Sequence, residues 1–252
     1  VILVDFSYKR PVIDQMAKAA RTLLILDHHE SAKNDLAGLA TPSPWGEHVD
    51  LRGPYGAAPA ALFDMERSGA GLTWDYFHPF KPRPAIINAI EDRDLWRFAR
   101  GGSKETSESL FSYPYSFAVW DEIIARTEHD PTALVVMHHE GAGILRKKLQ
   151  DIRNLLPVVQ RRMTIGGHDV PVANLPIVFT SDAGHIMCEG EAFAACYWDT
   201  ATGRVFSLRS RHTKGHGLDV SKVASLYGGG GHKDAAGFEV SWDVAAKLGL
   251  AS

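Results

Sequence analysis

Two apolar runs separated by a helical pattern constrain the fold of the N-terminal part more than any other feature. Residues 1–4 read Val-Ile-Leu-Val and residues 23–26 read Leu-Leu-Ile-Leu. Continuous aliphatic runs of this length are typical of strands that are buried on both faces. Residues 11–20 lie between them and have a helical pattern, with Pro11 in the first turn. A strand, a helix and a strand in so short a stretch predict a βαβ unit and therefore a parallel sheet.

The chain changes character near residue 130. Asp130 followed by Pro131 is a typical helix start. Apolar residues then repeat at helical spacing, and Pro157 should end or kink this helix; the repeat consists of Leu145, Leu149, Ile152, Leu156 and Val159. We expect an α/β protein with a helix-flanked parallel sheet in residues 1–130, a linker helix in 131–162 and a smaller α/β lobe in 163–252.

Local patterns predict further elements inside the two lobes. Helices are expected over residues 57–68, 85–90, 118–126 and 219–227, and strands over 169–175, 192–198 and 205–209.

Composition excludes several classes of protein. With 252 residues, 45% of them hydrophobic and 23% charged, the chain is neither disordered nor fibrous. The net charge of −3 gives no global basic field, so an anionic ligand has to be held by a local patch. The two cysteines have no metal-ligand or disulfide-framework spacing, and the apolar runs are too short for a membrane helix. We therefore expect a cytoplasmic protein without a membrane partner.

Acidic residues and histidines follow the predicted strands directly. Asp5 follows the first strand, and Asp27, His28 and His29 follow the second. Since parallel strands end at the same edge of a sheet about 5 Å apart, these side chains can share one or two metal ions. A mixture of carboxylates and imidazoles suits Mn²⁺, with Zn²⁺ as an alternative, and Asp92 offers a third acidic group. The alternative interpretation of Asp27-His28-His29 is a turn whose side chains are exposed to solvent.

Four consecutive glycines, residues 228–231, form the second notable pattern. Their backbone N–H groups can cradle an anion, and His232 and Lys233 follow at once with further donors. Upstream, Arg209 and Arg211 end a predicted strand with guanidinium groups suited to phosphate. A flexible surface loop is the alternative.

Together these two patterns resemble the DHH/DHHA1 phosphoesterases, a family that includes RecJ-like exonucleases, nano-RNases and cyclic-dinucleotide phosphodiesterases. The resemblance covers nearly the whole chain and implies an N-terminal DHH domain, a linker helix and a C-terminal DHHA1 substrate-binding domain. It implies a hydrolase that cleaves phosphoester bonds of short single-stranded oligonucleotides or nucleotide phosphates. The family's site holds two metal ions, here expected to be Mn²⁺. The resemblance is also compatible with a homodimer.

The resemblance also implies roles for individual residues. Asp5, His28 and Asp92 correspond to metal ligands, with Asp94 as a nearby competitor for the role of Asp92. Asp27 corresponds to the group that orients the imidazoles, and His29 to the neighbour that contacts the substrate phosphate. The implied phosphate clamp comprises Arg209, Gly229, Gly230 and His232.

The chain departs from the family pattern at its start. The family's first motif, with a histidine and two aspartates, precedes the strand that corresponds to residues 1–4. We therefore expect at most one weakly bound metal ion and impaired activity, and we expect in-frame coding sequence with the missing motif upstream of Val1. Two other functions stay open, an exopolyphosphatase-like hydrolase and a non-catalytic phosphate- or nucleotide-binding protein.

Overall fold

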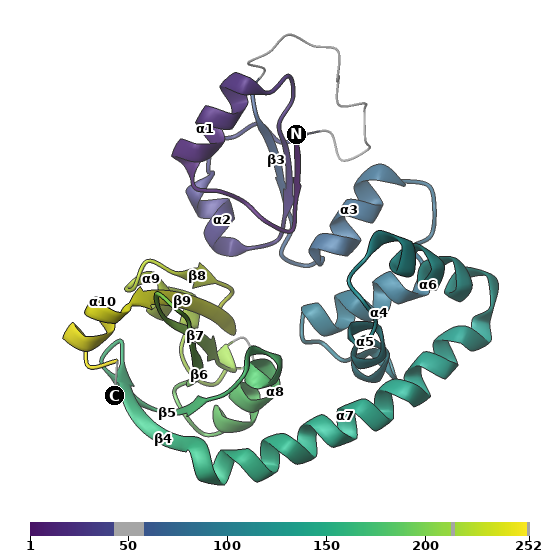
Figure 1. Ribbon diagram of the computed structural model, residues 1–252. Helices are drawn as coiled ribbons and strands as arrows, with labels where there is room; N and C mark the ends of the chain where they lie inside the picture. Colours follow the sequence, from purple (N-terminus) through teal and green to yellow (C-terminus); the bar gives the residue numbers. More distant parts are fainter. Residues whose placement is uncertain (43–57, 213–214, 251–252) are drawn as a thin grey trace. The chain divides into compact units, whose positions relative to one another are not determined.

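The computed structural model describes residues 1–42, 58–212 and 215–250 (Figure 1). They form two compact units, Val1–Arg146 and Lys147–Ser252. Among the helices of these described residues, none combines the length and the apolar character that crossing a lipid bilayer requires. The α/β class expected from the sequence is confirmed in both units.

The first unit begins with a parallel sheet in the order β1-β2-β3. These strands are Ile2–Val4, Leu24–Asp27 and Ala60–Phe63. Side chains of β2 (Leu24–Asp27) and the residue before it alternate between the faces. Leu23 and Ile25 pack against α1 (Arg10–Ala19) and Leu36, the residue that follows α2 (Glu30–Asp35), whereas Leu24 and Leu26 pack against α3 (Gly69–Phe77). Figure 1 shows α1 and α2 on one side of this sheet and α3 on the other. The predicted βαβ unit is therefore present, and helices on both faces explain its continuous aliphatic strands.

Two expectations for this sheet are wrong. The run at residues 1–4 is not fully buried, since Ile2 and Val4 are 43% and 46% exposed in a strand at the sheet edge. The described part of residues 57–68 is not a helix, because Ala60–Phe63 pairs in parallel with β2 as strand β3. Alanine and leucine favour a helix locally, but pairing with a buried strand outweighs that weak preference.

Four helices complete the first unit. They are α4 (Ala85–Asp94), α5 (Ser103–Phe111), α6 (Phe117–His129) and the first half of α7 (Pro131–Val159). Each contributes one fully buried side chain to a common core, namely Ile86, Leu110, Ile123 and Met137. The helices predicted near residues 85–90, 118–126 and 131 are confirmed.

The second unit is a mixed sheet in the order β4-β5-β6-β7-β9-β8. The strands are Gln160–Ile165, His168–Asn174, Ala194–Asp199, Gly203–Arg209, Ala235–Ser241 and, for β8, Gly230–Gly231. The described residues pair antiparallel except for β5 and β6, which are parallel and are connected through α8 (Ile177–Met187). Helix α8 and the end of α7 pack on one cluster of the sheet, and α9 (Val220–Ser225) and α10 (Trp242–Lys247) pack on another.

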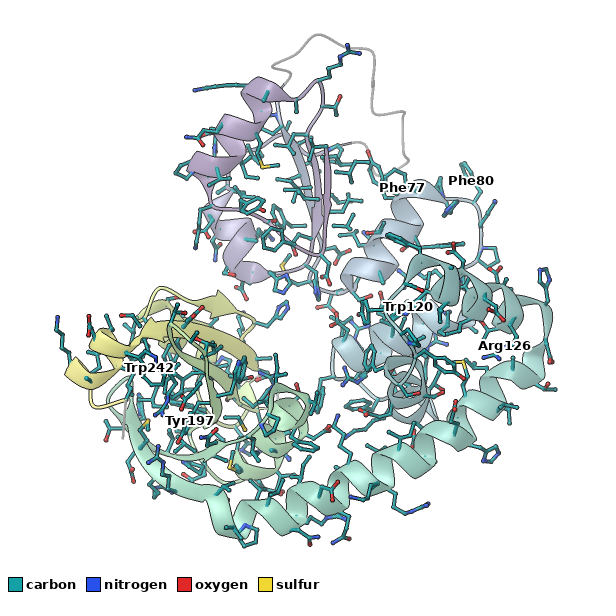
Figure 2. All side chains as sticks on the ribbon, viewed as in Figure 1. Phe77, Phe80, Trp120, Arg126, Tyr197 and Trp242 are labelled. Atoms are coloured by element: carbon teal, nitrogen blue, oxygen red, sulfur yellow. The ribbon has the colours of Figure 1, made fainter. Side chains whose placement is uncertain are left out.

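Tyr197 and Trp242, which are labelled in Figure 2, flank the buried Arg204 of this sheet. The guanidinium carbon of Arg204 lies 4.1 Å from the ring centre of Tyr197 and 5.7 Å from that of Trp242. Asp199 and the carbonyl of Leu250 accept its hydrogen bonds. The buried charge of Arg204 is therefore paired with a carboxylate and stabilises this lobe through hydrogen bonds within it.

Candidate metal centre

The carboxyl ends of β1 and β2 bring Asp5 and His28 together. The backbone N–H of Asp5 donates to the carbonyl of Leu26 at 2.8 Å, which extends the pairing of the two strands up to these residues. The His28 Nε2 atom lies 3.0 Å from Asp5 Oδ1. The His28 side chain is 3% exposed, while that of Asp5 is 53% exposed. A buried imidazole therefore points at a carboxylate that solvent can reach.

A second carboxylate lies against the same imidazole nitrogen. Asp94, the last residue of α4, places Oδ2 3.4 Å from His28 Nε2. Burial acts to lower the pKa of His28, but the hydrogen bond to Asp5 and the charges of Asp94 and Asp5 outweigh it and raise the pKa above its usual value. Partial burial and the neighbouring charge of Asp5 raise the pKa of Asp94, although the charge of His28 opposes this. Two carboxylates around one nitrogen form a negatively charged site that favours a cation.

Asp27 organises the turn that follows β2. Its Oδ1 accepts the backbone N–H groups of His28 and His29 at 2.7 and 3.3 Å, and the His29 Nδ1 atom lies 2.7 Å from the same oxygen. The Ser7 hydroxyl donates to Oδ2 at 2.6 Å. Burial acts to raise the pKa of Asp27, but the hydrogen bonds from His29 and Ser7 outweigh it, so the pKa is lowered. An ionised Asp27 places the proton of His29 on Nδ1, which leaves Nε2 directed away from Asp27.

Asp5, Asp27 and His29 form a group whose ligand atoms all lie within 4.8 Å of one another and could hold a metal ion. The first residue of this group is exposed, the second is buried and the third is intermediate. The predicted meeting of acidic and imidazole side chains at one sheet edge therefore exists in the first unit.

Asp92 has a different environment from Asp94. Its carboxylate accepts the backbone N–H groups of Ala99 and Arg100, each at 2.9 Å, and the hydroxyl of Ser103. Burial acts to raise the pKa of Asp92, but these hydrogen bonds outweigh it, so the pKa is lowered. The carboxylate thus holds the loop between α4 and α5 together. The geometry favours Asp94 over Asp92 as the acidic neighbour of His28.

The start of α3 is part of the same site, although no pattern in the sequence indicates it. A Cβ on Gly69 would lie 2.4 Å from the carboxyl carbon of Asp5, so the side chain of Asp5 rests on the first residue of the helix. Ser68 caps this helix by accepting the N–H of Gly71 at 3.0 Å. The positive end of a helix stabilises a nearby carboxylate. Asp5 itself has a φ of 57°, a left-handed conformation that aspartate tolerates better than most residues.

A cavity of about 390 Å³ in the first unit is lined in part by Asp5 and Gly69. Its walls are mostly apolar and include Trp74, Ile87 and Phe77, the last of which is labelled in Figure 2. Such walls do not suit a phosphate group.

The residues predicted to clamp phosphate lie in the second unit. The Arg209 guanidinium donates to the hydroxyls of Ser181 and Ser207 at 2.8 and 3.0 Å and to the carbonyl of Leu208 at 2.8 Å. Gly230 belongs to β8, and the N–H of His232 donates to the carbonyl of Ala235 at 2.8 Å.

Gly229 has a packing role in this region. A Cβ there would lie 2.1 Å from the carbonyl oxygen of Gly237 on β9. Gly229 therefore allows the segments around β8 and β9 to approach each other closely. This requirement comes from residues distant in the sequence, so the local sequence pattern does not indicate it.

No family model matches the chain. It is 28% identical over 249 residues to the uncharacterized protein R106 of Acanthamoeba polyphaga mimivirus, across 96% of this chain and 53% of that protein. The chain thus spans about half the length of this curated relative.

Among solved structures, the DHH domain of a member of the s1p family of ribosomal proteins is similar, with a TM-score of 0.56 at 12% identity over 100% of this chain and 68% of the other. The chain has the fold of a DHH-domain protein. PggH, a pGpG-specific phosphodiesterase from Vibrio cholerae, gives a TM-score of 0.42 at 13% identity over 98% of this chain and 86% of its own.

Proposed function

We propose that the chain acts as a metal-dependent phosphoesterase on short oligonucleotides or nucleotide phosphates. The observation that carries this proposal is the placement of His28 Nε2 3.0 Å from Asp5 and 3.4 Å from Asp94 at the carboxyl edge of a parallel sheet. Ligands in open α/β folds bind at this edge. The DHH-domain fold agrees with the proposal.

The side chains at this edge fit a divalent cation by their chemistry. One imidazole nitrogen and two carboxylates suit Mn²⁺ better than Mg²⁺, which prefers oxygen alone. A cation in place of the Nε2 proton would also offset the negative charges of Asp5 and Asp94; burial, and after it the charge of Asp5, raises the pKa of Asp94. In this proposal Asp94 takes the role that the sequence suggested for Asp92.

When bound, the cation would polarise a phosphoryl oxygen and generate a hydroxide nucleophile at neutral pH. The residues around it would then orient the substrate. Asp27 Oδ1 lies 2.7 Å from Nδ1 of His29 and orients this imidazole, and we assign His29 to contact with a phosphate oxygen of the substrate. In the second unit, we assign Arg209, Gly229, Gly230 and His232 to the binding of a phosphate group.

The first test is direct calorimetric titration of the chain with Mn²⁺. We expect one ion per chain, lost when His28 or Asp94 is replaced by alanine, and unchanged in the control Asp14→Asn, which removes an exposed carboxylate paired with Arg10. Absence of Mn²⁺ binding to the unaltered chain would contradict the proposed site.

The second test separates the three candidate functions. We expect slow, EDTA-sensitive hydrolysis of a 5′-phosphorylated RNA dinucleotide, because one ion provides only half of a two-ion arrangement. Release of phosphate from inorganic polyphosphate instead would favour the exopolyphosphatase alternative. Binding of the dinucleotide without any turnover would favour a non-catalytic nucleotide-binding protein.

A further inference from the structure

Glu91 joins two helices that border the candidate metal centre. Its Oε2 accepts the backbone N–H of Ser68 at 3.0 Å and the Ser68 hydroxyl at 3.4 Å. Its Oε1 accepts Arg83 Nη1 at 2.7 Å. The Glu91 side chain is only 14% exposed, so these charge-assisted contacts are shielded from solvent. One carboxylate thus connects the cap of α3 with the segment that leads into α4.

Each of these helices supports one of the two carboxylates at His28. The residue after Ser68 is Gly69, on which the side chain of Asp5 rests. Asp94 lies about one turn beyond Glu91 on α4 and reaches His28. A shift of α4 relative to the start of α3 would therefore change the gap between Asp5 and Asp94.

A second contact reinforces the same connection. Arg83 also donates to both carboxylate oxygens of Asp75 on α3, with Nε to Oδ1 at 2.7 Å and Nη2 to Oδ2 at 2.5 Å. Such a two-pronged contact fixes the direction of the guanidinium as well as its position. Glu91 therefore meets a partner that is itself held rigidly.

Gly71 makes room for this arrangement. A Cβ at this position would lie 2.1 Å from Glu91 Oε2 and 2.8 Å from Arg83 Nη1. Any other residue at position 71 would push the carboxylate of Glu91 away from Ser68.

We propose that Glu91 is a positioning residue that sets the spacing of Asp5 and Asp94 around His28 by fixing α4 against the start of α3. This inference rests on the proposed metal site. It assigns Glu91 no contact with the metal or the substrate.

The test uses substitutions that separate positioning from general stability. Glu91→Ala removes the connection, and we expect Mn²⁺ affinity to fall by about 10–100-fold, as is usual for groups that orient ligands. Glu91→Gln should recover part of this loss, because its amide oxygen can still accept the N–H of Ser68. Gly71→Ala leaves every charge in place and should nevertheless weaken Mn²⁺ binding, with no further loss when it is added to Glu91→Ala.

Gly143→Ala is the matched control. It is also a glycine inside a helix of the first unit, and a Cβ there would meet nothing within 4 Å. We expect it to leave Mn²⁺ affinity unchanged. Melting temperatures of all variants are measured alongside by circular dichroism. Lower melting temperatures with unaltered Mn²⁺ affinity in Glu91→Ala and Gly71→Ala would overturn the inference.

A second measurement tests the positioning role of Glu91 without Mn²⁺. If the unaltered chain binds no Mn²⁺, the proposed function fails. The imidazole signals of His28 in a long-range ¹H–¹⁵N spectrum then still report whether Glu91 positions the side chains around His28. Those signals should shift in Glu91→Ala and Gly71→Ala and not in Gly143→Ala. Unchanged signals would refute the positioning role.

Discussion

Two aspartates at the end of α4 have separate roles because of their position on the helix. Successive helical residues are about 100° apart, so Asp92 and Asp94 point in nearly opposite directions. Asp92 holds the loop that follows the helix, and Asp94 reaches His28. A sequence pattern with two aspartates so close together cannot say which one faces the sheet edge.

Asp92→Asn should lower stability and leave metal binding intact. The substitution weakens three hydrogen bonds to a buried carboxylate, and we expect a loss of about 1–3 kcal/mol in the free energy of unfolding, measured by urea denaturation. Because folding lowers the pKa of Asp92, its contribution is present above the ordinary value of 3.8 and is lost as the pH falls through the folded-state pKa. The variant should therefore lose less stability below pH 3.8 than the unaltered chain. A clear fall in Mn²⁺ affinity would show that Asp92 is a ligand after all.

Asp94→Asn should weaken Mn²⁺ binding without lowering stability. It removes one of two like charges at His28, so the melting temperature should stay the same or rise in the absence of metal. Mn²⁺ affinity should fall by more than about tenfold, the lower bound for groups that merely orient a ligand. Calorimetry and thermal melts on the same sample check both results. Retained Mn²⁺ affinity would show that Asp94 is not a metal ligand.

At the scale of elements, the sequence was informative where local and long-range requirements agree. The aliphatic run of β2 and the Asp130-Pro131 helix start predicted their elements, because burial or backbone geometry acts on those residues directly. The local pattern of residues 57–68 predicts a helix, but Ala60–Phe63 forms strand β3, because pairing with β2 decides its structure. The bordering role of α3 was also missed, since Gly69 is required only by its approach to Asp5.

Two glycines near β8 are required for different reasons, Gly229 for close packing and Gly228 for its positive φ, and their alanine variants should differ in stability. Gly229→Ala would place a Cβ 2.1 Å from a backbone oxygen of Gly237 and should destabilise the chain by about 3 kcal/mol. Gly228 has a φ of 79° with open space around it, so Gly228→Ala should cost only about 1 kcal/mol. Urea denaturation of both variants measures the difference. Equal losses would mean that the segments around β8 and β9 are not closely packed.

At the scale of the molecule, a single helix serves two separate cores. In the first half of α7, Met137 packs with α4, α5 and α6. In its second half, Ile152 and Leu156 pack with α8 and the second sheet. The boundary between the compact units falls inside the helix, after Arg146. The apolar stripe of the sequence predicted this helix, but a stripe does not tell which of two cores each residue joins.

This division predicts that residues 147–252 fold on their own. The fragment retains the second half of α7 and all the members of both clusters of the second sheet, so its apolar core loses nothing when the first unit is removed. With about 100 residues it is also of a usual size for an autonomous domain. We expect a cooperative thermal transition by circular dichroism and dispersed amide signals by NMR. Extending the fragment back to Pro131 should change the melting temperature little, because the added half of α7 has its packing partners in the first unit. A fragment that melts without cooperativity would show that the two units depend on each other for folding.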